Sequence, residues 1–581
     1  MSPFQVIVLA TPVFFLLIGI EVAYGIRKGR NTYRLNDAIT SISLGMLSQV
    51  TQVFTRLVRV GIYTAVYGSV ALWHDDAFWM AWYGWLLALV FYDVCYYWLH
   101  RLGHESAVLW AAHVVHHQSQ DYNLSTALRQ TSSGALLGWI FYMPMAIAGV
   151  PPLVFGVVAL VDLLYQFWVH TEHVPKLGWF DRWFCSPSNH RVHHAVNDRY
   201  LDRNYGGVLI VWDRLFGSFE EESEKCVYGT RGALNSWDPL WANAEVYWAL
   251  ARDSWHASSW LDKLRVWVKP PGWRPADIAA RFPREAFDLE KVQRFEPPMT
   301  KALAWFATLQ FTALLVGVVA FLWNAEGMPP ADALVWVLAQ CTAVWAIGAA
   351  MQGRITMTEV FLLELAALAT ATAAVGMTDI FRVLKPAVMA LAIIFVLRRG
   401  AVQWLLLAAL AFSMAGDILL PERFIPGLVS FLCAHICYIA LFKQDAPWFA
   451  SRKAFASTVA AAALMYAVLF PHLGLVLKIA VAAYALVIAC MAAQAIGRAT
   501  VLRDSRAFGV AIGAAIFMLS DSILAINKFA LPLPMAEFAV LATYYVAQLL
   551  IVHNVVMAGS NRSPAAFATS PKPLDAGSSP A

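Results

Sequence analysis

The histidines of this chain are grouped at spacings that suit metal binding. Ten of the fifteen histidines lie between His100 and His194. They form the groups His100-x3-His104, His113-x2-His116-His117, His170-x2-His173 and His190-x2-His193-His194. Because residues three or four apart share one face of a helix, each group can direct two or three imidazoles at one point. The pattern is typical of a metal centre.

The size of this set indicates more than one metal ion. The predicted metal ligands are His100, His104, His113, His116, His117, His170, His190, His193 and His194. They exceed the coordination number of a single ion, so we expect a dinuclear site. Imidazole suits iron, zinc and copper. Structural zinc normally takes cysteine ligands, and Cys185 is the only cysteine nearby. We predict two iron ions, because one-electron and O2 chemistry must come from a cofactor.

The composition places this centre in a membrane protein. Of the 581 residues, 60% are hydrophobic and 14% are charged, and apolar runs of spanning length recur along the chain. This excludes a soluble globular enzyme, a disordered protein and a secreted disulfide scaffold. The net charge of +4 gives no indication of nucleic acid binding. We predict an all-α fold: a polytopic integral membrane helix bundle with a cytoplasmic histidine-rich di-metal cap and a second C-terminal helix bundle.

Hydropathy divides the chain into regions. Spans are expected near 4–20, within 38–72, and at 78–99, 132–150, 152–169, 302–324, 331–350, 357–376, 380–397, 401–419, 425–442, 455–470, 475–496, 507–528 and 537–557. The predicted organisation is a metal-binding membrane domain with its cap (1–298), connecting helices (299–350), a second transmembrane domain (351–558) and a disordered tail (559–581). We interpret 4–20 as a retained helix, not a signal peptide.

The distribution of Lys and Arg predicts the orientation. If the loop at 27–34 is cytoplasmic and the spans alternate, the histidine segments and most basic loops fall on the same side. The histidine cluster and the C-terminus are therefore expected in the cytoplasm, with the inner membrane as the location in a bacterium.

Several strings around the histidines resemble the fatty acid hydroxylase/sterol desaturase superfamily, and within it the alkylglycerol monooxygenase branch. The strings cover roughly 20–230 and include RLNDAITSISLG (34–45), HRLGHE (100–105), LWAAHVVHHQSQDYNLSTALRQ (109–130), QFWVHTE (166–172) and SPSNHRVHHAVNDRYLDRNYGGVLIVWDRLFGSFEEE (186–222). The resemblance implies that the histidine-box residues bind iron. It also makes Glu105 a catalytic candidate, for which pairing with Arg101 or a box histidine is the alternative. The chain departs from the family pattern at Gln118 and at His173, whose role stays open.

The resemblance implies O2-dependent hydroxylation of a lipid carbon beside an ether oxygen, followed by collapse to a fatty aldehyde and a glycerol derivative. A membrane lipid and O2 are the implied partners, and tetrahydrobiopterin or another reductant is the implied electron source. The alternative is a fatty acid, sterol or carotenoid hydroxylase or desaturase with a non-catalytic C-terminal bundle. Candidate substrate-contacting or supporting residues are Tyr122, Asn123, Arg129, Asn204 and Tyr205, with ordinary polar roles in the cap as the alternative.

Ionisable residues inside the C-terminal spans indicate a second site. Such residues are costly in a bilayer and by default mark function, and Lys385, Asp417 and Asp521 come at similar depth from separate spans. An ion-paired structural lock is one alternative. A lipid transporter or lipid-binding protein, in which the acids line a pathway, is another.

This region, roughly 357–557, resembles the YhhN-like lysoplasmalogenases. The strings are LKPAVM (384–389), FSMAGDILL (412–420), FIPGLVSFLCAHICY (424–438), GAAIFMLSDSILAINKF (513–529) and YYVAQLLI (544–551). The resemblance implies hydrolysis of a vinyl ether, in which one acid protonates the enol ether and the other activates water. We predict that Asp417 and Asp521 are these acids and that Lys385 tunes one of them. His435 and Tyr438 are weaker candidates.

Overall fold

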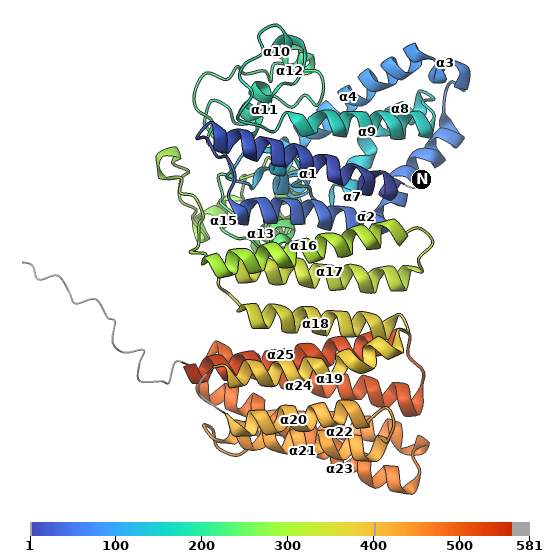
Figure 1. Cartoon of the computed structure of the whole chain (residues 1–581), viewed down its shortest axis with the longest axis vertical. Helices are drawn as coiled ribbons and strands as arrows, with labels where there is room; N and C mark the ends of the chain where they lie inside the picture. Colours follow the sequence, from blue (N-terminus) through green and yellow to red (C-terminus); the bar gives the residue numbers. More distant parts are fainter. Residues whose placement is uncertain (1–2, 400–402, 561–581) are drawn as a thin grey trace, which may run out of the picture. The chain divides into compact units, whose positions relative to one another are not determined.

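The computed structural model describes residues 3–399 and 403–560, and its regular elements there are helices (Figure 1). Strand pairing among these residues is limited to two isolated bridges, Phe184–Leu209 and Ala195–Tyr228. Ten of the described helices are long and apolar enough to cross a membrane. The predicted class, an all-helical polytopic membrane protein, is confirmed. The chain forms two compact units, residues 1–357 and the residues from 358 onward.

The first unit contains long membrane helices and many short ones. Its helices are α1 (Pro3–Arg27), α2 (Leu35–Val70), α3 (Asp76–Met80), α4 (Trp82–Glu105), α5 (Ala107–Ala111), η1 (Val114–His117), α6 (Leu124–Ala127), α7 (Gly134–Gly138), η2 (Trp139–Tyr142), α8 (Met143–Ile147), α9 (Pro152–Trp168), α10 (Phe180–Trp183), α11 (Pro187–His194), α12 (Val211–Phe216), α13 (Pro239–His256), α14 (Trp260–Val268), α15 (Ala276–Arg281), η3 (Leu289–Lys291), α16 (Lys301–Asn324) and α17 (Pro330–Met351).

Two apolar clusters hold the long helices of this unit together. One joins α2 to α1, α16 and α17 through residues such as Leu47, Phe311 and Val344. The other joins α4, α8, α9 and the second half of α2, where Tyr63 stacks on Phe155 with ring centroids 4.0 Å apart. Figure 1 shows α1, α2, α9, α16 and α17 running alongside one another. The segment 301–351 therefore packs as part of the first unit.

The expected span at 132–150 is not one continuous helix. It consists of three short helices, α7, η2 and α8, which pack against α2. Pro144 lies in the first turn of α8, where its missing N–H interrupts the hydrogen-bond ladder of a continuing helix. Part of its apolar surface packs against α2, whereas Leu136 and Ile140 are exposed.

A buried carboxylate fixes the polar cap to α4. Asp93 accepts hydrogen bonds from the backbone N–H of Val208 (2.7 Å) and Leu209 (3.0 Å), and from the Trp212 indole N–H (2.8 Å). A second buried acid, Asp213, accepts hydrogen bonds from the N–H groups of Tyr205 and Gly206, both at 2.7 Å. These contacts hold the 205–213 segment against the helix that carries His100 and His104.

The second unit is a bundle of hairpins around one apolar core. Its helices are α18 (Met357–Ala374, whose first residue closes the first unit), α19 (Thr378–Leu397), α20 (Trp404–Leu419), α21 (Phe424–Lys443), α22 (Arg452–Leu469), η4 (Phe470–His472), α23 (Leu475–Leu502), α24 (Ser505–Ala525), η5 (Ile526–Ala530, a π-helical turn) and α25 (Ala536–Ser560). The most extensive pairings are α24 with α25 and α20 with α21. The predicted disordered tail lies, from 561 onward, outside the described residues.

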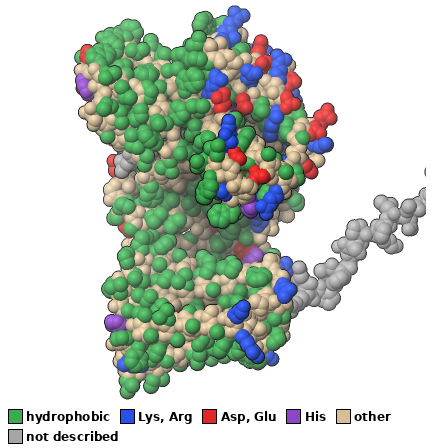
Figure 2. Space-filling view, turned by 180° about the vertical axis from the view of Figure 1, so that it is seen from behind, with side chains coloured by type: hydrophobic (Ala, Val, Ile, Leu, Met, Phe, Trp, Pro, Cys, Tyr) green, Lys and Arg blue, Asp and Glu red, His purple; other side chains and the backbone are tan. Residues whose placement is uncertain are grey.

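The surface of the first unit is strongly asymmetric. Figure 2 shows Lys, Arg, Asp and Glu side chains gathered over one side of this unit, whereas hydrophobic side chains cover most of the rest of the visible face. Exposed apolar residues such as Leu16, Leu86 and Leu309 lie on the long helices. A belt of this kind beside a charged end fits a bilayer-embedded bundle with one polar cap.

The Asp93 contacts yield a stability prediction. Asp93→Ala leaves three N–H donors without their acceptor, two of them on the backbone, so we expect the free energy of unfolding to fall by roughly 2–5 kcal/mol. Thermal unfolding in detergent would measure the change. Asp76→Ala is the matched control, because Asp76 makes only a solvent-exposed 3.3 Å contact with Tyr67. Equal melting temperatures for the two variants would contradict this role.

Candidate functional site

The nine predicted metal-binding histidines lie together in the first unit, in two groups. The first group is His100, His104, His113, His117 and His193, and the second is His116, His170, His190 and His194. Within each group, the candidate ligand nitrogens all lie within 4.8 Å of one another. Among the described residues, neither group includes a cysteine or a carboxylate. The structure thus provides two all-imidazole cages, and ligation by these residues stays a prediction.

Four separate elements deliver these rings. The last turn of α4 carries His100 and His104, and the 3₁₀ turn η1 carries His116 and His117. The helix α11 carries His190, His193 and His194. His170 follows the end of α9. The two groups are interleaved along the chain, because neighbouring residues such as His116 and His117 belong to different groups. The tight 3₁₀ turn divides His113, His116 and His117 between the two cages, and the eight-residue helix α11 does the same for His190, His193 and His194.

Four of these nine rings are anchored through Nδ1 by backbone carbonyl oxygens. Nδ1 of His100 lies 2.7 Å from the Tyr205 carbonyl oxygen, and Nδ1 of His116 lies 3.0 Å from that of Arg129. Nδ1 of His170 and of His193 contact the carbonyl oxygens of Gln166 (2.8 Å) and Arg203 (3.1 Å). A carbonyl oxygen only accepts, so each Nδ1 carries the proton and each Nε2 carries a lone pair. Metal-binding histidines are typically oriented by this kind of contact.

Several Nε2 atoms then face one another in an arrangement suited to binding a cation. Nε2 of His116 lies 3.2 Å from Nε2 of His170, and Nε2 of His100 lies 3.1 Å from that of His113. Burial lowers the pKa of His116 to about 4, and it lowers the pKa values of His113 and His170 well below the usual range, so these rings are neutral at pH 7. Because His116 and His170 both carry the proton on Nδ1, their facing Nε2 lone pairs repel. A metal ion between them would turn this repulsion into coordination, so the donor set fits metal binding.

Two further nitrogens point to the same conclusion. Nε2 of His104 and Nε2 of His193 are buried and have no hydrogen-bond partner among the described residues. Both belong to the first group. Buried polar atoms are rarely left without a partner, and a coordinated ion would satisfy both.

The other sequence candidates in this unit support the cage. Arg129 is buried, and its guanidinium donates to the Val115 carbonyl (2.8 Å) while its own carbonyl anchors His116. Tyr122 donates to the Val169 carbonyl at 3.0 Å, just before His170. Asn123 caps α6, and Asn204 bridges the carbonyls of Asn189 and Glu220. Tyr205 combines an anchoring carbonyl with a buried hydroxyl that lacks a partner among the described residues.

Three sequence candidates lie away from the two groups. Glu105 pairs with Arg101 (2.9 Å), one of the two arrangements considered, and its side chain is 41% exposed. His173 packs edge-on against Tyr24 of α1, with ring centroids 5.3 Å apart. Gln118 donates to the Ala242 carbonyl at 3.1 Å and so helps to hold α13. A catalytic role for Glu105 stays a prediction.

Glu21 of α1 is a supporting residue that the sequence reasoning missed. This buried carboxylate accepts hydrogen bonds from the Tyr33 hydroxyl, from the Leu124 N–H (2.9 Å) and from the Thr171 hydroxyl (2.5 Å). It therefore ties α1 to the residue that follows His170. An acid within an apolar span is a signal in itself, and the reasoning applied to the C-terminal spans would have identified it.

The second unit brings its three predicted residues to the wall of one pocket. Lys385, Asp417 and Asp521 line a pocket with a cavity volume of about 90 Å³ whose other walls are largely apolar, with Leu420, Leu428, Phe431, Leu524 and Leu541 among them. The Lys385 ammonium lies 3.2 Å from Asp417 Oδ1, and Asp417 is buried. The Asp521 side chain is 18% exposed. Two acids thus face the same largely apolar pocket.

Each acid is held by a tyrosine that the sequence reasoning did not select. The Tyr544 hydroxyl donates to Asp417 Oδ2 at 2.9 Å, and the Tyr484 hydroxyl donates to Asp521 Oδ2. Nε2 of His435 lies 2.9 Å from the Tyr484 hydroxyl, so His435 supports Asp521 through Tyr484. Tyrosine within an apolar helix carries little signal in a sequence, because most such residues are simply packed.

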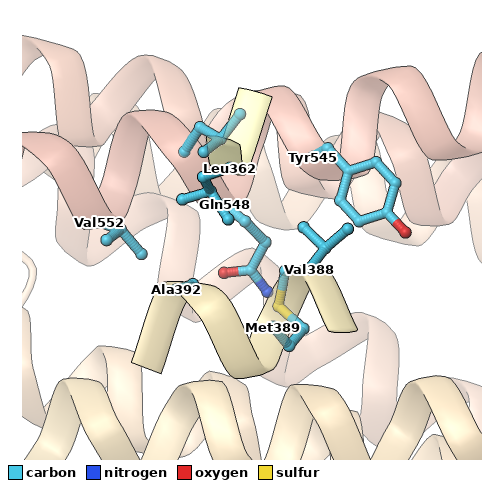
Figure 3. Close-up of a pocket in the computed structure, with 8 residues that line it drawn as sticks. Leu362, Val388, Met389, Ala392, Tyr545, Gln548 and Val552 are labelled. Atoms are coloured by element: carbon cyan, nitrogen blue, oxygen red, sulfur yellow. The ribbon is translucent and has the colours of Figure 1, made fainter. Parts of the chain in front are cut away.

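A second, narrower cleft lies between α18, α19 and α25 (Figure 3). Val388, Met389, Tyr545 and Gln548 are among its lining residues. Gln548 accepts from the Tyr438 hydroxyl at 2.5 Å and donates to Ser413 at 3.1 Å. Tyr438 is thus part of a buried polar network, and no acid lines this cleft.

Comparison with known proteins agrees with both halves of the geometry. The fatty acid hydroxylase family matches residues 85–218, and the YhhN family matches residues 380–555. Alkylglycerol monooxygenase from Homo sapiens is 38% identical over 308 residues, which cover 53% of this chain and 68% of the relative. The Danio rerio alkylglycerol monooxygenase is 39% identical over 321 residues, with the same coverage.

The C-terminal relatives are matched over a smaller share. Lysoplasmalogenase TMEM86B from Rattus norvegicus is 34% identical over 154 residues, which cover 26% of this chain and 61% of the relative. No solved structure matches the chain. By the extent of the first match, the chain belongs to the alkylglycerol monooxygenase family, and it joins a fatty acid hydroxylase domain to a YhhN domain.

Proposed function

We propose that the first unit is a di-iron monooxygenase that hydroxylates an alkylglycerol ether lipid beside the ether oxygen. The main support is the pair of all-imidazole cages, in which four rings anchored through Nδ1 keep their Nε2 atoms as bare lone pairs. The nine histidines would hold two iron ions, which supply the O2 activation that side chains alone cannot perform. One oxygen atom enters the C–H bond and the other leaves as water. A reductant such as tetrahydrobiopterin provides the electron pair.

The residues around the cages keep the site rigid and dry. The backbone carbonyls behind His100, His116, His170 and His193 hold each ring in one orientation, which keeps the donor geometry fixed during turnover. Asp93 and Asp213 hold the covering segment. The alkyl chain of the substrate would lie among the membrane helices while its glycerol faces the polar cap. The hydroxylated carbon is a hemiacetal, which collapses to a fatty aldehyde and glycerol.

For the second unit, we propose vinyl-ether hydrolysis of a lysoplasmalogen-type lipid, with a different role for each acid. The ion pair with Lys385 stabilises Asp417 as a carboxylate, which suits it to take a proton from water. Asp521 has no Lys or Arg partner among the described residues, and only its Oδ2 receives the Tyr484 proton. Its Oδ1 can therefore carry a proton toward the enol-ether carbon. Water adds to the resulting oxocarbenium ion, and the hemiacetal releases a fatty aldehyde.

We further propose that the histidine cages and the C-terminus face the cytoplasm. The loops on the side of the cages carry most of the Lys and Arg residues near the spans, which is the bias found in cytoplasmic loops. The charged side of the first unit agrees with this orientation. We also propose the cap boundary at residue 298 as the end of the metal-binding region.

The metal assignment predicts a specific loss from each cage. His113→Ala and His190→Ala should each reduce bound iron from about two ions to about one per chain, because each removes a ligand from a different group. Iron can be counted by elemental analysis of the purified protein. His173→Leu, outside both groups, should keep the full iron content. Unchanged iron in both cage variants would exclude this assignment.

The two activities should separate by mutation. His193→Ala should abolish O2-dependent aldehyde release from an alkylglycerol and leave anaerobic aldehyde release from a lysoplasmalogen intact. Asp521→Asn should do the opposite, with a loss of about 10²–10⁴-fold in the hydrolytic rate, the range typical of general acid–base groups. Aldehyde can be quantified by mass spectrometry. Loss of both activities in either variant, in protein that remains folded, would contradict two independent sites.

The roles of the two acids can be distinguished by chemical rescue. Asp417→Ala removes the group that activates water, so azide, which needs no deprotonation, should restore part of the turnover as an azide adduct or its breakdown product. Asp521→Ala removes the proton donor, and azide should not help it. Tyr438→Phe, in the neighbouring polar network, serves as the control with near-normal turnover. Rescue of Asp521→Ala in place of Asp417→Ala would reverse the assignment.

A further inference from the structure

The end of α24 contains an irregular turn that contributes to the wall of the acid pocket. After Ala525 the helix continues as the π-helical turn η5, Ile526–Ala530. The pocket-lining residues of this stretch come in pairs: Ser520 and Asp521, Leu524 and Ala525, Lys528 and Phe529. The pairs repeat every four residues, and the last pair contains Lys528.

The π turn explains how Lys528 shares a face with Asp521. In an α-helix of 3.6 residues per turn, a repeat of four residues drifts by about 40° at each step. A π turn contains more residues per turn, so it compensates for this drift and keeps the last pair directed toward the pocket. Single π turns in α-helices occur frequently at functional sites.

Lys528 is a cation without a carboxylate partner. Its ammonium lies 4.8 Å from the centre of the Phe424 ring, and among the described residues it forms no ion pair. The other lysine of the pocket, Lys385, is paired with Asp417. Because the wall between them is mostly apolar, Lys528 provides the one unpaired cation among the described residues that line the pocket. An anionic group entering here would meet a charge that no protein group neutralises.

The position of this cation relative to the acids sets the shape of the ligand. Lys528 follows Asp521 by seven residues, which corresponds to about 10 Å along a helix. A vinyl ether placed at the acid pair is joined to the rest of the lipid through a three-carbon glycerol. A phosphate ester on the far carbon of that glycerol would extend along the helix toward Lys528. The apolar walls would accept hydrocarbon.

We propose that Lys528 binds the phosphate ester of a lysophospholipid and so selects a phosphate-bearing alkenyl lipid over a neutral alkenylglycerol. This inference rests on the proposed hydrolase function for its choice of lipid. It assigns the two units different head-group classes: the first takes a neutral glycerol ether, and the second a phosphate ester.

The chain contains a matched control in Lys478. This residue lies near the start of α23, with its ammonium 3.9 Å from the centre of the Phe470 ring, and it does not line the pocket. Both lysines belong to the same end of the bundle, where η4, α23 and η5 meet in one apolar cluster. A lysine that merely extends toward the membrane surface would behave like Lys478.

The first test measures binding in the absence of turnover. Full-length protein in zwitterionic nanodiscs is titrated, without O2, with a saturated-ether lysophospholipid, with the matching alkylglycerol and with inorganic phosphate. Lys528→Met should weaken binding of the phospholipid about tenfold, as expected for one lost charge-assisted contact, and leave the alkylglycerol unchanged. Lys528→Arg should retain binding, and Lys478→Met should match the wild type. Equal losses in the two lysine variants, or inorganic phosphate displacing the phospholipid at equal concentration, would overturn the proposal.

The second test uses kinetics to separate this inference from the hydrolase proposal. With a phosphate-bearing alkenyl lipid, Lys528→Met should raise KM about tenfold with kcat largely retained, and with an alkenylglycerol it should change neither. An unchanged KM in a hydrolytically active Lys528→Met protein refutes the phosphate site alone. Phosphate-dependent binding that needs Lys528 in a protein without hydrolytic activity refutes the hydrolase alone.

Discussion

The structure of the first unit depends on keeping neutral imidazoles packed against one another. Burial makes protonation of these rings unfavourable, and the backbone carbonyls behind them place the protons on Nδ1, so that lone pairs face inward. Without cations, such an arrangement stores repulsion. The contacts from Arg129, Tyr122, Asn204 and Asp213 can be understood as the restraint that holds it. The membrane helices support the histidine groups, whereas contacts within the cap set the orientation of the individual rings.

The second unit also contains polar groups within an apolar helix bundle, but it stabilises them differently. Each acid receives the hydroxyl of a tyrosine from a neighbouring helix, and only Asp417 also has a cation. The two acids thus differ in their surroundings: Asp417 is buried beside Lys385, whereas the Asp521 side chain is 18% exposed and lies 3.6 Å from Nε2 of His435.

The features of this protein that depend on residue type and spacing could be predicted from its sequence. The histidine boxes, the helical class and the three charged residues of the second unit could be inferred because imidazoles at spacings of three and four, long apolar runs and charges within spans are unusual. Features that depend on distances between residues in the folded chain could not be predicted in this way. The division of the boxes into two groups, with His116 and His117 on different sides, needs the 3₁₀ turn. The segment 132–150 was misjudged because an apolar run appears the same whether it spans a bilayer or packs as short helices.

The hydrogen bonds of Glu21 have a consequence for how the protein is made. Its helix is synthesised first, but two of its donors lie 103 and 150 residues further along the chain, at Leu124 and Thr171. During biogenesis, only the nearby Tyr33 is at hand for this carboxylate. The first helix therefore enters the bilayer before Glu21 can form its hydrogen bonds to Leu124 and Thr171. Its hydrogen bond to Thr171 cannot form until the segment that carries His170 has emerged from the ribosome and folded back, so the contact between α1 and this segment is completed only after the first helix has been made.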